Sequence, residues 1–199
     1  SLGLMNDLTT QVITKALDAA EEFRGMEPSI GCMTVNLELG QISENELGPF
    51  VRDAARAHPD LSLCIELNER SLRSVTDDLR RDAEIMQEAG VIIALDDYGS
   101  DDSSVGSLVH FPMNILKIDK SLIDDLGDAR QREVIKALQG FGNNLGYTMV
   151  VEGIETPAMV DIMVELGVRS AQGYHFGRPL SFAHTVDRLR RWGTQAIVN

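Results

Sequence analysis

The sequence predicts an α/β fold, because helical and strand patterns alternate along almost the whole chain. One helix is followed by six strand–helix units, and repeated units of this kind require a parallel sheet with right-handed crossovers. Polar residues also fall within or at the end of every predicted strand: Asn36, Glu66, Asp96, Asp97, Lys117, Glu152 and Gln172. A TIM-like barrel gathers such groups at the carboxyl ends of its strands, whereas an open sheet gathers them near one switch point. We therefore predict a TIM-like (β/α) barrel.

Three of the predicted strands lie in the first half of the chain. Apolar residues at helical spacing predict a helix over 7–24, followed by a strand at 32–37. A second helix ends near His58, and a second strand covers 61–67. A helix over 70–89, closed by Gly90, then leads to the apolar run at 92–95. This run fits a strand buried on both faces, and it continues directly into two aspartates.

The second half of the chain continues the alternation. We predict a short helix at 103–109, a strand at 115–119, a helix at 129–145 and a strand at 147–152. A helix over 157–166, a strand at 168–171 and a helix over 182–192 follow. No linker divides the chain, so residues 1–199 are predicted to form a single domain. Six strands are two fewer than a TIM barrel has, so we expect an N-terminally truncated barrel whose missing strands precede residue 1.

Composition excludes several classes of partner. The net charge of −13 argues against non-specific binding to DNA, RNA or acidic membrane surfaces. A phosphate ligand stays compatible with that charge, because bound divalent cations reverse the local sign of a site. No apolar run is long enough to insert into a membrane. Cys32 and Cys64 lack metal-ligand spacing and are predicted to be reduced core residues of a cytoplasmic protein.

Asp96 and Asp97 are the most unusual pair in the sequence. Two adjacent carboxylates at the end of a buried strand repel each other, so they need a cation, a proton or a basic partner. A metal ion would supply the first, and Lys117 would supply the last. A solvated turn is the alternative for the pair taken by itself. For Glu66, the alternative to a metal site is a structural ion pair with Lys117.

Six short motifs follow one another in register along the chain: Val35-Asn36-Leu37, Ile65-Glu66-Leu67-Asn68-Glu69, Asp96-Asp97-Tyr98-Gly99, Leu116-Lys117-Ile118-Asp119, Glu152-Gly153-Ile154-Glu155 and Gln172-Gly173-Tyr174. Together they resemble the EAL domain family, whose members linearise the bacterial second messenger cyclic di-GMP or only bind it. The resemblance covers essentially the whole chain. It implies a barrel of the EAL type with about six of its eight strands present, and a metal-dependent phosphodiesterase that converts cyclic di-GMP to linear pGpG.

The resemblance also implies a role for each matched residue. Asn36, Glu66 and Asp96 resemble ligands of a first Mg²⁺ or Mn²⁺ ion. Asp96 would bridge to a second ion, also held by Asp97 and Glu152. The catalytic set would be Lys117, which positions or deprotonates the attacking water, Gln172 near that water, and Glu69, which holds the loop after the aspartates. Glu155 would be a supporting carboxylate, and no substrate-binding residue is assigned. A homodimer and fusion to sensory or cyclase domains are compatible with the family.

Departures from the family pattern leave a second function open. The Glu-Ala-Leu motif is absent, so we expect this chain by itself to be feebly active or inactive. Asn68 replaces the usual threonine, Asn114 replaces an aspartate, and Ser100 to Asp102 replace the usual loop sequence. The alternative is therefore a degenerate EAL domain that acts as a cyclic di-GMP receptor or as a protein-interaction module without catalysis.

Overall fold

The computed structural model describes residues 2–100 and 105–192. The chain divides into two compact units. The first contains Ser1–Ile65, Thr76–Ile92 and Pro179–Asn199, and the second contains Glu66–Val75 and Ile93–Arg178. The organisation of 1–199 as one domain stays a prediction, and each unit is described by itself.

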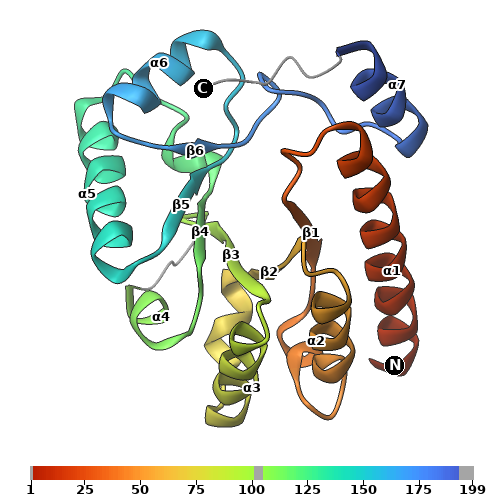
Figure 1. Cartoon of the computed structure of the whole chain (residues 1–199). Coiled ribbons are helices and arrows are strands. Elements are labelled where there is room, and N and C mark those ends of the chain that lie inside the picture. Colours follow the sequence, from red (N-terminus) through yellow and green to blue (C-terminus); the bar gives the residue numbers. More distant parts are fainter. Residues whose placement is uncertain (1, 101–104, 193–199) are drawn as a thin grey trace. The chain divides into compact units, whose positions relative to one another are not determined.

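Six strands form a sheet in which the order β1-β2-β3-β4-β5-β6 follows the order of the chain (Figure 1). They are β1 (Cys32–Asn36), β2 (Ser62–Asn68), β3 (Ile92–Tyr98), β4 (Ile115–Ile118), β5 (Thr148–Val151) and β6 (Ser170–Ala171). The pairings of β3 with β4, β4 with β5, and β5 with β6 are parallel. Helices separate the strands along the chain, which confirms the predicted α/β fold and the expected number of strands.

The first unit is built on α1 (Leu2–Met26), which extends beyond both ends of the predicted 7–24 helix. Ile13, Leu17 and Ala20 of α1 are buried in the core. The ring of Phe23 stacks on Phe182, with 5.3 Å between centroids. Phe182 begins α7 (Phe182–Trp192), so this stack joins the two helices (Figure 1). The unit also contains the 3₁₀ helix η1 (Leu39–Ile42), α2 (Gly48–Ala57) and α3 (Asp77–Glu88).

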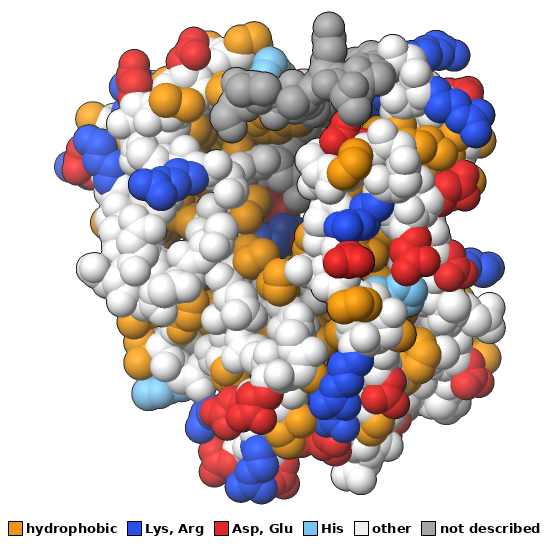
Figure 2. All heavy atoms as spheres, in the orientation of Figure 1, with side chains coloured by type: hydrophobic (Ala, Val, Ile, Leu, Met, Phe, Trp, Pro, Cys, Tyr) orange, Lys and Arg blue, Asp and Glu red, His pale blue; other side chains and the backbone are white. Residues whose placement is uncertain are grey.

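Charged side chains cover the outer side of α3. Figure 2 shows acidic and basic groups intermixed over this helix. Two pairs one turn apart are close: Asp77 and Arg80 at 3.1 Å, and Asp78 and Arg81 at 3.9 Å. Exposed pairs of this kind contribute little to stability, so this surface is a solvated helix face and is not a candidate binding site.

The predicted helix over 70–89 is wrong in its first part, over 70–76. Glu69–Ser74 forms the 3₁₀ helix η2, and Val75 is extended. The α-helix begins only after Thr76, whose side-chain oxygen accepts a hydrogen bond from the Leu79 amide at 3.2 Å. The apolar spacing indicates one helix, but the segment contains two, because Asn68 caps the start of η2 and Thr76 caps the start of α3. The break leaves Glu69 beside the end of β2.

The second unit packs helices on the strands that carry most of the candidate site residues. Besides η2, its helices are α4 (Val105–His110), the 3₁₀ helix η3 (Lys120–Leu122), α5 (Ala129–Leu145) and α6 (Pro157–Glu165). Leu95, Leu116, Ile118, Met149 and Val151 of the strands are buried, and α5 lies along β5 (Figure 1). Residues 103–104 of the predicted 103–109 helix lie outside the described residues. The predicted strand at 168–171 shortens to two residues.

Three side chains that stood out in the sequence, those of Asn114, Cys64 and Cys32, have clear surroundings. Asn114 Oδ1 accepts a hydrogen bond from the Ile93 backbone amide at 2.9 Å, and the backbone N–H of Asn114 donates to Ile93 O at 2.8 Å. An aspartate at that position would accept the same bond, so this departure from the family pattern preserves the contact. Cys64 is buried as expected. Cys32, predicted to be a core residue, is exposed at the start of β1, because its side of the strand is uncovered.

Within the part of the chain that the structure describes, none of the helices combines the length and the apolar character that a membrane span requires.

Replacing Gly173 with alanine is expected to destabilise the protein by about 2–3 kcal/mol, since the added methyl group overpacks a rigid site. A Cβ at Gly173 would lie 2.1 Å from Ile154 O and 2.4 Å from Ile154 N, both backbone atoms. Gly140 in α5 is the matched control, because nothing lies within 4 Å of its would-be Cβ. Gly140→Ala is expected to stabilise by roughly 0.5–1 kcal/mol. Urea denaturation of both variants measures the difference, and equal midpoints would contradict the packing argument.

Candidate functional site

A β-bulge brings the two aspartates of β3 together. Leu95 pairs with Leu116 and Tyr98 pairs with Ile118, so Asp96 and Asp97 both stand opposite Lys117 alone. In a regular strand, neighbouring side chains point to opposite faces. The bulge, with Asp97 at a φ of 60°, changes this alternation and places carboxylate oxygens of both residues in one cluster. Aspartate tolerates the left-handed region better than most residues.

Lys117 gathers three carboxylates from neighbouring strands. Its Nζ lies 2.8 Å from Glu66 Oε1, 2.8 Å from Asp96 Oδ1 and 2.7 Å from Glu152 Oε1. Lys117 is only 6% exposed. Burial lowers the pKa of Lys117, but the carboxylates of Asp96, Glu152 and Glu66 outweigh burial and raise the pKa overall. The ammonium is therefore charged at neutral pH, and it draws the three carboxylates toward one point.

Carboxylate oxygens of Asp96, Asp97 and Glu152 all lie within 4.8 Å of one another. This is the one group of three metal-binding side chains among the described residues. Asp96 Oδ1 is buried, and no described residue offers it a hydrogen bond of good geometry, although Lys117 Nζ is at ion-pair distance. A buried carboxylate oxygen of this kind retains a coordination direction. The donor set is all oxygen, and it fits Mg²⁺ or Mn²⁺ better than zinc.

Two carboxylates of the cluster, those of Asp97 and Glu152, have raised pKa values. Burial raises the pKa of Asp97, and the negative charges of Asp96 and Asp119 raise it further, against Lys117 and a hydrogen bond from Asn68. Burial also raises the pKa of Glu152, while Lys117 opposes that shift. Lys117 alone therefore does not neutralise the cluster. An additional positive charge would be stabilised here.

Next to the cluster is a cavity of about 220 Å³. Glu152, Glu155 and Gln172 line it, so three of the predicted site residues border one space. Backbone hydrogen bonds connect the two segments that carry these residues: Gln172 N donates to Val151 O at 2.8 Å, and Ile154 N donates to Gln172 O at 3.1 Å. Lys120, Gly153, Gly173 and Tyr174 complete the lining. The cavity is an opening through which a small ligand would reach Glu152.

Two of the remaining predicted residues have different surroundings. Glu69 is 8% exposed in η2. The pKa of Tyr98 on β3 is raised, first by the burial of Tyr98 and second by the negative charge of Glu69. Glu69 therefore lies near the strand that carries the aspartate pair. Asn36 is the exposed last residue of β1 and belongs to the first unit, so its role as a ligand stays a prediction. Asp101 and Asp102 of the altered loop lie outside the described residues.

The sequence reasoning assigned no site role to three residues that lie at the site. Asn68 donates a hydrogen bond from Nδ2 to Asp97 Oδ2 at 2.6 Å. Tyr174 lines the cavity, and the guanidinium carbon of Arg178 lies 4.3 Å from the centre of its ring. The signal for Asn68 was its departure from the family pattern beside Glu69. Tyr174 stands in the last of the matched motifs without a role of its own, and for Arg178 the sequence favoured a salt bridge over contact with a ligand.

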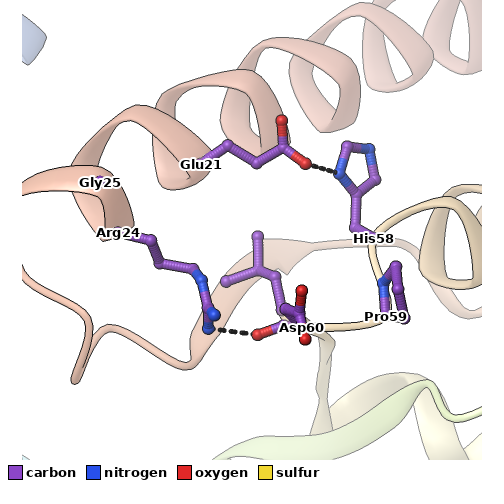
Figure 3. A pocket seen from close by; sticks show the side chains of 7 residues that line it. Glu21, Arg24, Gly25, His58, Pro59 and Asp60 are labelled. Atoms are coloured by element: carbon purple, nitrogen blue, oxygen red, sulfur yellow. Dashed lines mark hydrogen bonds and ion pairs between the residues drawn. The ribbon is translucent and has the colours of Figure 1, made fainter.

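A second cavity, of about 320 Å³, lies in the first unit and is not the candidate site. Three of its polar side chains, those of Glu21, Arg24 and His58, contact one another or the backbone (Figure 3). His58 Nδ1 lies 2.6 Å from Glu21 Oε1, while Arg24 donates to Ile30 O at 3.2 Å and to Asp60 O. The cavity is also beside the residues that precede β1 and β2, and the amino ends of barrel strands serve stability more often than chemistry.

The chain is similar to a known protein family and to several known proteins. The profile of the EAL domain family matches residues 1–179. The oxygen sensor protein DosP of Escherichia coli K12 is 30% identical over 182 residues, which are 90% of this chain and 23% of DosP. The signaling protein YkoW of Bacillus subtilis is 28% identical over 183 residues, 89% of this chain and 22% of YkoW. The chain thus spans less than a quarter of the length of these relatives.

Solved structures show the same fold. The cAMP-bound EAL enzyme Bd1971 superposes with a TM-score of 0.82 at 21% identity, over 94% of this chain and 53% of that chain. The phosphodiesterase PaMucR in complex with c-di-GMP gives a TM-score of 0.78 at 28% identity, over 92% of this chain and 75% of that chain. BlrP1 of Klebsiella pneumoniae, as a calcium and cyclic di-GMP complex, gives a TM-score of 0.70 at 26% identity, over 83% of this chain and 43% of that chain. These matches confirm the predicted TIM-like fold of the EAL type.

Proposed function

The chain belongs to the EAL domain family, and we propose that it hydrolyses cyclic di-GMP to linear pGpG with the help of two divalent metal ions. The observation that carries this proposal is the convergence of Glu66, Asp96 and Glu152 on Lys117, with Asp97 beside them. A structural ion pair needs one carboxylate for one lysine. Three carboxylates on one lysine, and a fourth nearby, form a cluster whose excess negative charge suits cations.

The proposed metal ligands are Asp96, Asp97 and Glu152, joined by Glu66 and Asn36. Mg²⁺ or Mn²⁺ fits these oxygen donors, and Asp96 would be shared between two ions. Bound ions would supply positive charge to the phosphodiester and lower the pKa of the attacking water. The polypeptide supplies the rest: four carboxylates held in a fixed arrangement, and a cavity that leads to Glu152.

We assign positioning of the attacking water to Lys117 rather than its deprotonation. With Glu66, Asp96 and Glu152 within 2.8 Å of its Nζ, Lys117 is arranged as a charged ammonium, which donates hydrogen bonds and has no lone pair with which to accept a proton. Gln172, which lines the cavity, would orient the same water through its amide, and Glu155 would support the wall beside it. Glu69 would hold the loop after the aspartates, in line with its position near Tyr98.

The proposed partner is cyclic di-GMP, and we propose no binding of DNA or RNA. We place the domain in the cytoplasm, where that nucleotide is found. A homodimer belongs to this proposal as an implication of the family resemblance. Fusion to sensory or cyclase domains belongs to it because the relatives are much longer than the matched region. The alternative function is a cyclic di-GMP receptor. It is motivated by the sequence from Ser100 to Asp102, which differs from the family pattern.

Chromatography of cyclic di-GMP incubated with the full-length protein tests the proposal. We expect linear pGpG to accumulate in the presence of Mg²⁺ or Mn²⁺. Its accumulation should stop when EDTA removes the metal. Calorimetry on the same preparation separates the alternatives. Tight nucleotide binding with no product over hours would replace the phosphodiesterase by a receptor. An absence of both binding and product would leave a protein-interaction module.

A further inference from the structure

We propose that Asn68 is a positioning residue that orients the Asp97 carboxylate for metal binding. This inference rests on the proposed function, because it concerns the same metal site. Its basis is the hydrogen bond of 2.6 Å from Asn68 Nδ2 to Asp97 Oδ2, which joins the end of β2 to the bulge of β3.

Asn68 is held in place from two directions. Its Oδ1 accepts a hydrogen bond from the Arg70 amide at 3.0 Å, as the cap of η2. Its carbonyl oxygen accepts a hydrogen bond from Ser71 Oγ at 2.6 Å. The side-chain amide therefore cannot rotate without losing the cap. With Oδ1 fixed on the Arg70 amide, Nδ2 is directed at Asp97.

Asp97 requires a partner of this kind. Its backbone is in the left-handed region, and its carboxylate lies near the negative charges of Asp96 and Asp119. Repulsion from these charges favours rotation of the Asp97 side chain away from the cluster. A neutral donor such as Asn68 opposes this rotation without adding a positive charge that would compete with a metal ion.

The hydrogen bond leaves the carboxylate able to bind a metal. Each carboxylate oxygen has two lone-pair directions, so Oδ2 can accept from Asn68 and still coordinate, and Oδ1 is a second donor atom. Residues that hydrogen-bond to metal ligands commonly set the affinity of the site. A threonine at this position, as the family pattern has, carries a shorter side chain. Asn68 therefore gives this chain its own means of fixing Asp97.

Two variants separate the two roles of Asn68. Asn68→Ala removes both the cap and the donor. Asn68→Ser keeps an oxygen that can cap the Arg70 amide, but its side chain ends one atom earlier and does not reach Asp97. Asp128→Ala is the matched control, because Asp128 caps α5 through the same contact, accepting from the Arg130 amide at 2.8 Å, away from the cluster.

Calorimetric titration of the full-length protein with Mn²⁺, without nucleotide, is the test. Binding that is lost in Asp96→Asn defines the site. We expect Asn68→Ala and Asn68→Ser to weaken that binding by about 10- to 100-fold, and Asp128→Ala to leave it unchanged. Turnover of cyclic di-GMP by both Asn68 variants should then recover as Mn²⁺ is raised, which a defect in folding alone would not allow.

The outcomes distinguish the two proposals. Unchanged Mn²⁺ affinity in Asn68→Ser, with wild-type binding intact, would overturn the role of Asn68 and leave the proposed function standing. Absence of Mn²⁺ binding by the wild-type protein would overturn both, since a site that binds no metal has no metal ligand to position.

Discussion

Lys117→Met should destabilise the metal-free protein by about 3–5 kcal/mol, the usual cost of removing one partner from a buried ion pair. Methionine fills a similar volume, so the loss is one of charge. Glu66, Asp96 and Glu152 would lose the ammonium that lies within 2.8 Å of each. Their side chains are 13%, 19% and 20% exposed, so water would compensate only in part. Chemical denaturation in EDTA measures the effect.

The control for this variant is Lys136→Met. Lys136 pairs with Glu133 at 3.0 Å on α5, with both side chains largely exposed. Removal of a surface pair changes stability by about 0.5 kcal/mol or less. If Lys117→Met were as mild as Lys136→Met, the three carboxylates would not depend on the lysine for charge balance, and the description of the cluster would be wrong.

Asp96→Asn should reduce cyclic di-GMP turnover by on the order of 10³-fold or more, since several kcal/mol of transition-state stabilisation would depend on the metal that Asp96 holds. The fold should survive the change. Asparagine has the same shape, and removal of the negative charge relieves the repulsion that raises the pKa of Asp97. We expect the unfolding temperature to stay within about 4 °C of the wild type.

Asp161→Asn is the matched control for Asp96→Asn, because Asp161 is an exposed carboxylate of α6. Its turnover should equal that of the wild type. Product release at the wild-type rate by Asp96→Asn would remove Asp96 from the metal site and reject the two-metal mechanism. A large drop in unfolding temperature would instead assign Asp96 a structural role.

The repeated strand–helix order could be predicted from the sequence because it depends on local periodicity. The apolar run ending at Leu95 is part of a strand. Asp96 and Asp97 lie in the last part of β3 and Lys117 in the last part of β4, while Glu152 and Gln172 directly follow β5 and β6. Parallel strands in sequence order bring those ends to one edge. The contacts of Lys117 with Glu66 and Glu152 are therefore a consequence of topology, and the sequence contained enough to expect them.

What could not be predicted depends on local backbone choices. The residues from Glu69 to Ser74 have helical apolar spacing, but the caps at Asn68 and Thr76 divide the segment. Asp96 and Asp97 stand out in the sequence, yet strict alternation would place them on opposite faces, and only the pairing of β3 with β4 reveals the bulge. The donor role of Asn68 depends on that same bulge.

The bulge makes the site depend on the length of β3 as well as on its composition. Two residues, Asp96 and Asp97, occupy the space opposite Lys117, and the pairing becomes regular again at Tyr98. Deletion of either aspartate would restore an unbroken ladder from Leu95 to Tyr98 and would leave a single carboxylate opposite the lysine. The chain would gain a more regular sheet and lose its site. The second carboxylate therefore depends on the number of β3 residues between two pairings, that of Leu95 with Leu116 and that of Tyr98 with Ile118.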